Sequence, residues 1–165
     1  MPLQRECATQ AEPLGIAAIY ALLHHAYGPQ RWWPGETPFE IMVGAVLTQN
    51  TAWHNVEKAI ARLREAGWLE AGAIDALPQE LLEERIRPAG CFRVKARRLK
   101  TLCAWYLQQG GFEALRRWPT GKLRHALLAI HGIGPETADD ILLYAFSRPV
   151  FVIDAYTRRI FSRLG

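Results

Sequence analysis

The stretch LLAIHGIGPETADDILLYAFSRPVFVID, residues 127–154, decides which fold this chain can adopt. It reads as the end of one helix, a tight turn with two glycines, a second helix that opens at Pro135, and an apolar run that ends in Asp154. The glycines permit positive φ and bring backbone N–H groups to the surface at a helix N-terminus, where an anion is favoured. The turn is therefore predicted to bind a phosphate group.

The second helix and the run that follows it carry separate signals. Proline suits the first position of a helix, and an apolar stripe at helical spacing continues to Ala145. The pair Arg148-Pro149 then ends the helical pattern. Residues 150–153, VFVI, look like a buried segment, which would bring Asp154 to the edge of a cavity beside the turn.

These residues resemble the helix-hairpin-helix, the Gly/Pro-rich loop and the catalytic aspartate of the endonuclease III-like DNA glycosylases. Residues 1–12 show no periodicity, so a flexible N-terminus is expected there. The resemblance covers residues 13–165 and implies an all-α domain, a bundle of short helices. It also implies which residues form the hairpin that binds DNA phosphate: His131, Gly132, Ile133, Gly134 and Thr137. Family members continue further and often bind a 4Fe–4S cluster, so a cluster is expected only in a C-terminal continuation beyond Gly165.

Composition agrees with a helical protein of about one domain. The chain has 165 residues, half of them apolar, and no apolar run approaches the roughly 18 residues needed to span a bilayer. Its three cysteines are too far apart in the sequence for a metal site, and their odd number argues against a disulfide framework. No metal and no cofactor is therefore predicted within this chain. We expect a monomer in the cytoplasm of a bacterial-type cell, associated with the nucleoid and not with a membrane.

A second stretch, WWPGETPFEIMVGAVLTQNT at residues 32–51, narrows the resemblance. It is similar to the corresponding stretch of the bacterial 3-methyladenine DNA glycosylases, which belong to the endonuclease III-like group. In that branch aromatic residues of this loop line the base pocket, so Trp32 and Trp33 are candidates for a wall on which a base stacks. The alternative is a loop that two large apolar side chains pin onto the core.

Two turns are candidates for insertion into DNA from which a base has been extruded. The resemblance places Gln49 where family members insert a glutamine into the gap, and the alternative is an ordinary amide at a helix end. It places Cys91 and Phe92 at a second wedge, and core packing of Phe92 is the alternative. An extruded base leaves an unstacked hole, so a polar plug has a clear purpose.

A basic segment follows the second of these turns. Its charged residues are Arg93, Lys95, Arg97 and Arg98, within a helical apolar pattern. Such a run is usually a solvated helix face. Next to a phosphate-binding hairpin it is also a candidate for contacts with the DNA backbone, because such contacts supply most non-specific affinity.

The chemistry depends on two acidic residues. Asp154 can cap the next helix and can also act as the catalytic carboxylate, which stabilises an oxocarbenium-like sugar or aligns a water. The resemblance places Glu136 where lyases of the family carry the lysine that forms a Schiff base. Glutamate suits the first turn of a helix but cannot form an imine.

The sequence therefore predicts an enzyme that flips a damaged base out of double-stranded DNA and hydrolyses its N-glycosidic bond without efficient strand cleavage. Alkylated purines such as 3-methyladenine are the expected substrates, because a tryptophan can hold a cationic base by stacking and cation–π attraction. One alternative is an endonuclease III-type enzyme for oxidised pyrimidines. The other is a non-catalytic helix-hairpin-helix module that binds DNA.

Overall fold

The computed structural model describes residues 15–30 and 32–164, and within them every regular element is a helix. The all-α prediction is thus confirmed, whereas the flexible segment predicted for residues 1–12 lies outside the described residues. The contacts divide the chain into two compact units, one of residues 33–153 and one of residues 1–32 with 154–165.

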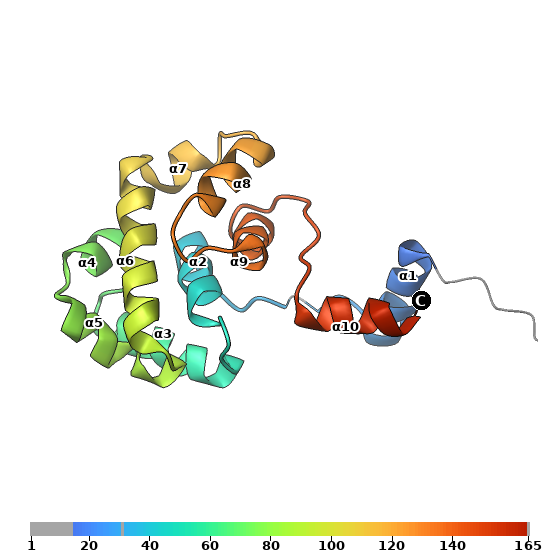
Figure 1. The fold of residues 1–165 in the computed structure, drawn as a ribbon, viewed down its shortest axis with the longest axis horizontal. Helices are drawn as coiled ribbons and strands as arrows, with labels where there is room; N and C mark the ends of the chain where they lie inside the picture. Colours follow the sequence, from blue (N-terminus) through green and yellow to red (C-terminus); the bar gives the residue numbers. More distant parts are fainter. Residues whose placement is uncertain (1–14, 31, 165) are drawn as a thin grey trace, which may run out of the picture. The chain divides into compact units, whose positions relative to one another are not determined.

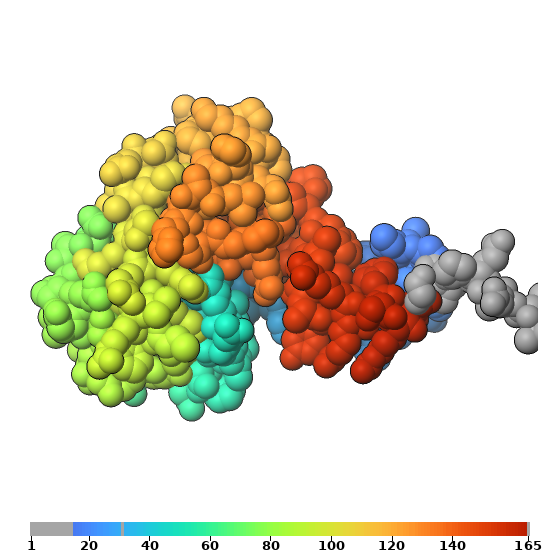
Figure 2. Space-filling model, viewed as in Figure 1, coloured from blue at the N-terminus to red at the C-terminus, as the bar shows by residue number. Residues whose placement is uncertain are grey.

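The unit of residues 33–153 contains short helices joined by tight turns (Figure 1). In chain order its helices are α2 (Pro38–Leu47), α3 (Trp53–Glu65), α4 (Ala71–Ala76), α5 (Gln79–Arg85), η1 (Arg87–Ala89), α6 (Phe92–Gln108), α7 (Gly111–Leu115), α8 (Thr120–Leu128), α9 (Pro135–Asp140) and η2 (Ile141–Ala145). In the space-filling view their side chains form a continuous packed body (Figure 2).

Helix α2 is the centre of this unit, and a local capping pattern explains where it begins. The Glu40 N–H donates to the Thr37 hydroxyl at 3.1 Å, with Pro38 at the first helical position. From Phe39 to Leu47 every residue is buried. The helix packs against α3, α6, α9 and η2, so its C-terminal end lies among the segments that the sequence marks as functional.

The helix-hairpin-helix consists of α8, a turn at residues 129–134, and α9 with its continuation η2. The continuation is a π-turn, in which the Phe146 N–H donates to the Ile141 carbonyl at 3.2 Å. The predicted helix from Pro135 is confirmed, with its last turn widened. The predicted burial of the run after it is wrong, because Phe151 is 59% and Ile153 is 52% exposed in an extended connection.

The other unit contains α1 (Ile16–Tyr27) and α10 (Ala155–Leu164). Helix α1 ends at Tyr27, and the glycine that follows it, Gly28, has a φ of 67°, which suits a glycine at the end of a helix. None of the helices in residues 15–30 and 32–164 combines the length and the hydropathy that a membrane crossing requires.

Candidate functional site

The hairpin turn uses its two glycines in different ways. Gly132 has a φ of 89°, and a Cβ built on it would lie 2.5 Å from the Arg98 Cγ. Gly134 has a φ of −90°, so of the two hairpin glycines only Gly132 uses the positive φ that glycine permits. A Cβ on Gly134 would meet no described atom within 4 Å, so the surface in front of the α9 N-terminus is open.

The side chains of the hairpin divide between solvent and core. His131 and Glu136 are exposed, while Ile133 is 4% and Thr137 is 5% exposed. A phosphate contact by Ile133 or Thr137 would therefore use the backbone. Across the hairpin, Arg124 on α8 donates to both carboxylate oxygens of Asp139 on α9, at 2.7 and 2.9 Å, and so joins the two helices.

Gln49 lies in the loop of residues 48–51, here called the base-gap loop, and is bound to the hairpin. Its amide nitrogen donates to the Gly132 carbonyl at 3.2 Å and to the Thr137 hydroxyl at 2.9 Å. The Arg98 guanidinium donates to the Gln49 amide oxygen. These bonds fix the base-gap loop against the hairpin turn over a sequence separation of more than 80 residues.

The second predicted wedge lies at residues 87–92, here called the wedge turn. Cys91, the N-cap residue of α6, is exposed, and its backbone adopts the left-handed conformation, with φ 44° and ψ 31°. Phe92 is half-buried against the core, and the guanidinium carbon of Arg87 lies 5.0 Å from its ring centroid. In this structure Phe92 therefore packs on the protein, which is one of the two alternatives that the sequence left open.

The four predicted basic contacts differ in exposure. Arg93 and Arg97 are exposed, and Arg98 is half-buried beneath the hairpin. Lys95 is 1% exposed, and its Nζ donates to three protein oxygens. The prediction that Lys95 contacts DNA is therefore wrong in this structure, because its charge points into the protein. Burial lowers the pKa of this lysine from its ordinary value.

The two predicted pocket tryptophans also differ. Trp32 is 67% exposed. Trp33 packs on the core, where a Cβ on Gly44 would come within 3.2 Å of its indole. Its ring centroid lies 5.3 Å from that of Trp53 and 5.0 Å from that of Tyr144. Trp33 therefore pins the loop, as one alternative predicted, and forms one side of an aromatic cluster.

A cavity of about 290 Å³ adjoins this cluster, and its lining includes Trp33, Trp53 and the carboxylate-bearing Glu57. The Trp53 indole N–H donates to Glu57 at 3.0 Å. Sequence reasoning missed Trp53 and Tyr144. For Trp53 a signal was available, because this tryptophan stands two residues after the base-gap loop in the sequence.

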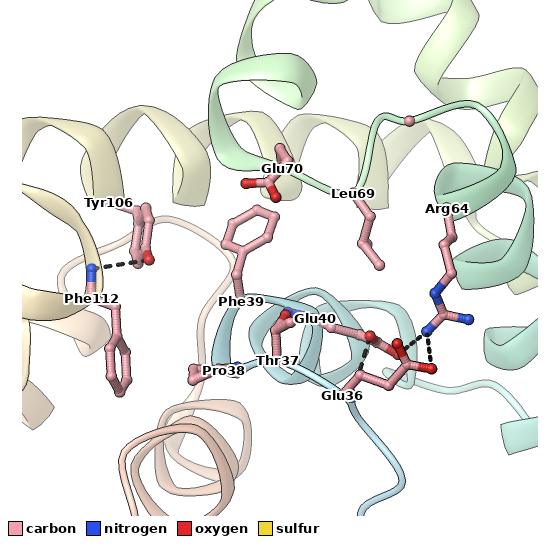
Figure 3. A pocket seen from close by; sticks show the side chains of 11 residues that line it. Glu36, Thr37, Pro38, Phe39, Glu40, Arg64, Leu69, Glu70, Tyr106 and Phe112 are labelled. Atoms are coloured by element: carbon pink, nitrogen blue, oxygen red, sulfur yellow. Dashed lines mark hydrogen bonds and ion pairs between the residues drawn. The ribbon is translucent and has the colours of Figure 1, made fainter.

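A second cavity, of about 530 Å³, lies at the N-terminal end of α2 (Figure 3). Glu40 in its wall is 5% exposed and pairs with Arg64 at 2.7 Å. The Tyr106 hydroxyl accepts from the Phe112 N–H at 2.9 Å. None of the residues predicted as functional lines this cavity, although it shares Glu36, Glu40 and Arg64 with the cavity beside Trp33 and Trp53.

Asp154 caps α10, which is one of the two compatible roles, capping and catalysis, that the sequence predicts for it. Its carboxylate accepts from the Thr157 N–H at 2.6 Å, and its carbonyl accepts from the Arg158 N–H at 3.1 Å. The carboxylate orientation is thereby fixed relative to the helix that follows it.

No group of three or more His, Cys, Asp or Glu side chains within the described ranges is arranged to hold a metal ion. Cys91, the N-cap of α6, is exposed, whereas Cys103 is buried within that helix, twelve residues further along the chain. A cluster in a continuation beyond Gly165 stays a prediction.

Comparisons with known proteins agree with this geometry. The family model described as the HhH-GPD superfamily base excision DNA repair protein matches residues 43–165. A protein of Methanocaldococcus jannaschii, provisionally named a DNA repair glycosylase, is 49% identical over 91% of this chain and 70% of its own length. Endonuclease III of Thermotoga maritima is 30% identical over 78% of this chain, which spans 57% of that protein.

Solved structures show the same similarity. The Helicobacter pylori 3-methyladenine DNA glycosylase MagIII, bound to 1,N6-ethenoadenine, superposes with a TM-score of 0.78 and 35% identity, over 90% of this chain and 71% of MagIII. A trapped covalent intermediate of endonuclease III with DNA superposes with a TM-score of 0.71 and 27% identity, over 89% of this chain and 68% of that protein. The chain therefore belongs to the HhH-GPD superfamily of base excision DNA repair proteins, as a homologue of the endonuclease III-like DNA glycosylases.

Proposed function

We propose that this chain removes a damaged base from double-stranded DNA by hydrolysis of the N-glycosidic bond, without efficient cleavage of the strand. The observation that carries the proposal is the pair of residues at the family's two reactive positions. The carboxylate is present at Asp154, and the position of the lyase lysine holds Glu136.

Asp154 supplies the chemistry of base removal. Departure of the base leaves positive charge on the sugar, and a fixed carboxylate stabilises that charge or aligns a water for attack on the anomeric carbon. The hydrogen bond from the Thr157 N–H orients the carboxylate before substrate binds. Water and one carboxylate suffice for this reaction, so we propose no cofactor within residues 1–165.

Glu136 accounts for the absence of efficient strand cleavage. A lyase of this family needs an amine that attacks the sugar carbon and forms an imine. A carboxylate cannot form this bond, and the exposed Glu136 sits in the first helical turn of α9. The proposed product is therefore an intact strand with an abasic site.

DNA binding uses the hairpin, the base-gap loop and the basic face of α6. The open backbone at Gly134 supports a phosphate contact, with Arg93 and Arg97 as further candidates for the DNA backbone. Gln49 would leave its protein partners and occupy the gap of the extruded base, while the wedge turn contacts the opposite side of that gap. The protein is proposed to act as a monomer.

Alkylated purines are the proposed substrates. An N3- or N7-alkylated purine carries positive charge. The indole rings of the aromatic cluster attract such a charge by cation–π interaction, and the Glu57 carboxylate beside them attracts it electrostatically. The cavity beside Trp33, Trp53 and Glu57 supports this choice, as does the similarity to MagIII. The similarity to endonucleases III favours oxidised pyrimidines as the second candidate.

The test is release of free base from methylated duplex DNA by the wild-type protein and by Asp154→Asn. Asparagine is as good an N-cap as aspartate, so this variant keeps α10 but removes the carboxylate. We expect 3-methyladenine release that the variant lacks, with strand nicks only after treatment with alkali. Nicks without alkali would contradict the absence of a lyase.

The same assay distinguishes the two alternative functions, an enzyme for oxidised pyrimidines and a non-catalytic DNA-binding module. Release from an oxidised-pyrimidine duplex, with none from methylated DNA, would replace the proposed substrate. A non-catalytic binding module would retain duplex binding and release no base from either substrate, with or without Asp154.

A further inference from the structure

Lys95 joins the two turns that are proposed to enter the DNA gap. Its Nζ donates to the Leu47 carbonyl at 2.8 Å, to the Thr51 hydroxyl at 2.8 Å and to the Ala89 carbonyl at 2.7 Å. An ammonium group has three N–H donors, so these bonds account for all of them. Leu47 directly precedes the base-gap loop, Thr51 is the last residue of that loop, and Ala89 belongs to the wedge turn.

Both turns contain a non-glycine residue in the left-handed region. Asn50 has a φ of 51° and Cys91 has a φ of 44°. Such backbone persists only where the surroundings hold it, and it is concentrated at functional sites. Two acceptors of Lys95, in Leu47 and Thr51, lie on either side of Asn50 in the sequence. The third, in Ala89, lies two residues before Cys91. The Thr51 hydroxyl also donates to the Ala89 carbonyl and links the two turns directly.

Stability alone is a poor reason for this arrangement. The three acceptors are two carbonyls and a hydroxyl, all of them uncharged, and the lysine side chain is 1% exposed. Burial of a charge without an opposite charge is unfavourable, and apolar residues often replace buried charges without loss of stability. What the ammonium provides, and an apolar side chain does not, is a directional link among three backbone and hydroxyl oxygens.

We propose that Lys95 is a positioning residue that fixes the distance between the base-gap loop and the wedge turn. With that distance fixed, Gln49 and the wedge turn fit DNA whose helix is opened at a lesion and fit stacked duplex poorly. The inference rests on the proposed function. It assigns Lys95 to the discrimination between damaged and undamaged DNA and not to a phosphate contact.

The experiment compares affinity for a duplex with an abasic-site analogue and affinity for the matched undamaged duplex, over a series of salt concentrations. Lys95→Met keeps the length of the side chain and removes its donors. Lys100→Met is the matched control, because it makes the same change of charge on α6 at a lysine whose Nζ donates, within residues 15–30 and 32–164, to the Asp75 carbonyl alone, at 2.7 Å.

We expect Lys95→Met to lose the preference for the abasic duplex by about tenfold or more, with affinity for undamaged duplex within about twofold of wild type. The salt dependence should keep its slope, since a lost phosphate contact would lower that slope by about one. Lys100→Met should keep the wild-type preference.

A second pair of variants tests the link with the lysine in place. Thr51→Val removes the hydroxyl that Lys95 and Ala89 share, and Thr51→Ser restores it. We expect the valine variant to lose preference for the abasic duplex and the serine variant to regain it. This pair decides the matter if Lys95→Met does not fold, as judged by its circular dichroism and thermal unfolding.

Three outcomes would overturn the inference: an unchanged preference in Lys95→Met and Thr51→Val, an equal loss of affinity for both duplexes, or a reduced salt slope. A wild-type protein with no preference for the abasic duplex would instead contradict the proposed function, and with it the premise of the inference. Base release by wild type is measured in parallel, so the two failures are distinguishable.

Discussion

Arg98 lies across Gly132, so closely that a Cβ at position 132 would be 2.5 Å from the arginine Cγ and 2.6 Å from its Nε. The arginine comes from α6 and the glycine from the hairpin turn. The absence of a side chain at Gly132 therefore permits both the left-handed backbone and the contact between two distant segments.

Gly132→Ala should destabilise the protein and Gly134→Ala should not. At Gly132 the methyl group meets the arginine and the φ of 89° strains an L-residue, so we expect a loss of about 1–3 kcal/mol in the free energy of unfolding. At Gly134, with φ −90° and open space, we expect a change within about 0.5 kcal/mol. Urea denaturation measures both, and equal effects would contradict the assignment of strain.

A bulky residue at the second glycine should affect DNA binding without affecting folding. Gly134→Leu has room in the free protein but covers the backbone that is proposed to approach a phosphate. We expect about tenfold weaker binding to abasic-site DNA with a near wild-type melting temperature. Unchanged affinity would remove the phosphate role from this turn.

The variant Glu136→Lys should form a covalent Schiff-base intermediate with abasic DNA, as a lyase does. The substitution places an amine at the position of the family's Schiff-base lysine, on an exposed first turn of α9. We expect borohydride to trap a covalent complex with abasic DNA in Glu136→Lys but not in wild type or in Glu136→Gln. Trapping by the wild-type protein would show that another amine serves, and would count against a monofunctional enzyme.

The ion pair across the hairpin should contribute to stability. Arg124 binds both oxygens of Asp139, whose side chain is 12% exposed, whereas that of the arginine is 40% exposed. Arg124→Met leaves a largely buried carboxylate without this partner, so we expect a loss of about 1–2 kcal/mol after allowance for solvent screening. A double-mutant cycle with Asp139→Ala should give a coupling of about 1 kcal/mol, and additive effects would argue against the pair.

Thiol reactivity should distinguish Cys91 from Cys103. Burial raises the pKa of Cys103 to about 12, so at pH 8 almost none of this buried thiol is in the reactive thiolate form. Cys91 is exposed. In a Cys7→Ser background, mass spectrometry should find maleimide on Cys91 alone, and abasic-site DNA should slow that reaction. Rapid labelling of Cys103 in the folded protein would contradict its burial.

Local signals in the sequence predicted local structure well. The predicted cap at Asp154 is confirmed, and the Thr37-Pro38 start of α2 and the Gly28 end of α1 follow the same kind of pattern, which depends on residues within a few positions of one another. Such signals are readable because the backbone geometry at a helix end restricts the residue that can occupy it.

Predictions that depended on distant residues were less accurate. Lys95 looked like part of a basic surface, because its three acceptors lie 6, 44 and 48 positions away in sequence. The sequence alone does not show which of the two hairpin glycines has a positive φ, and of the pair only Gly132 does. The contact of Trp33 with Gly44 and Trp53 likewise depends on tertiary packing, which no local pattern encodes.

The π-turn at Ile141–Ala145 limits how the chain length can vary in this region. A π-turn has one residue more than an α-turn of the same helix, and one residue corresponds to a rotation of about 100°. Deletion of a residue between Asp140 and Phe146 would regularise the hydrogen bonds and redirect all of the chain that follows. Insertions and deletions should therefore be tolerated far less here than in the exposed turn at Gly67, where a Cβ would meet no described atom within 4 Å.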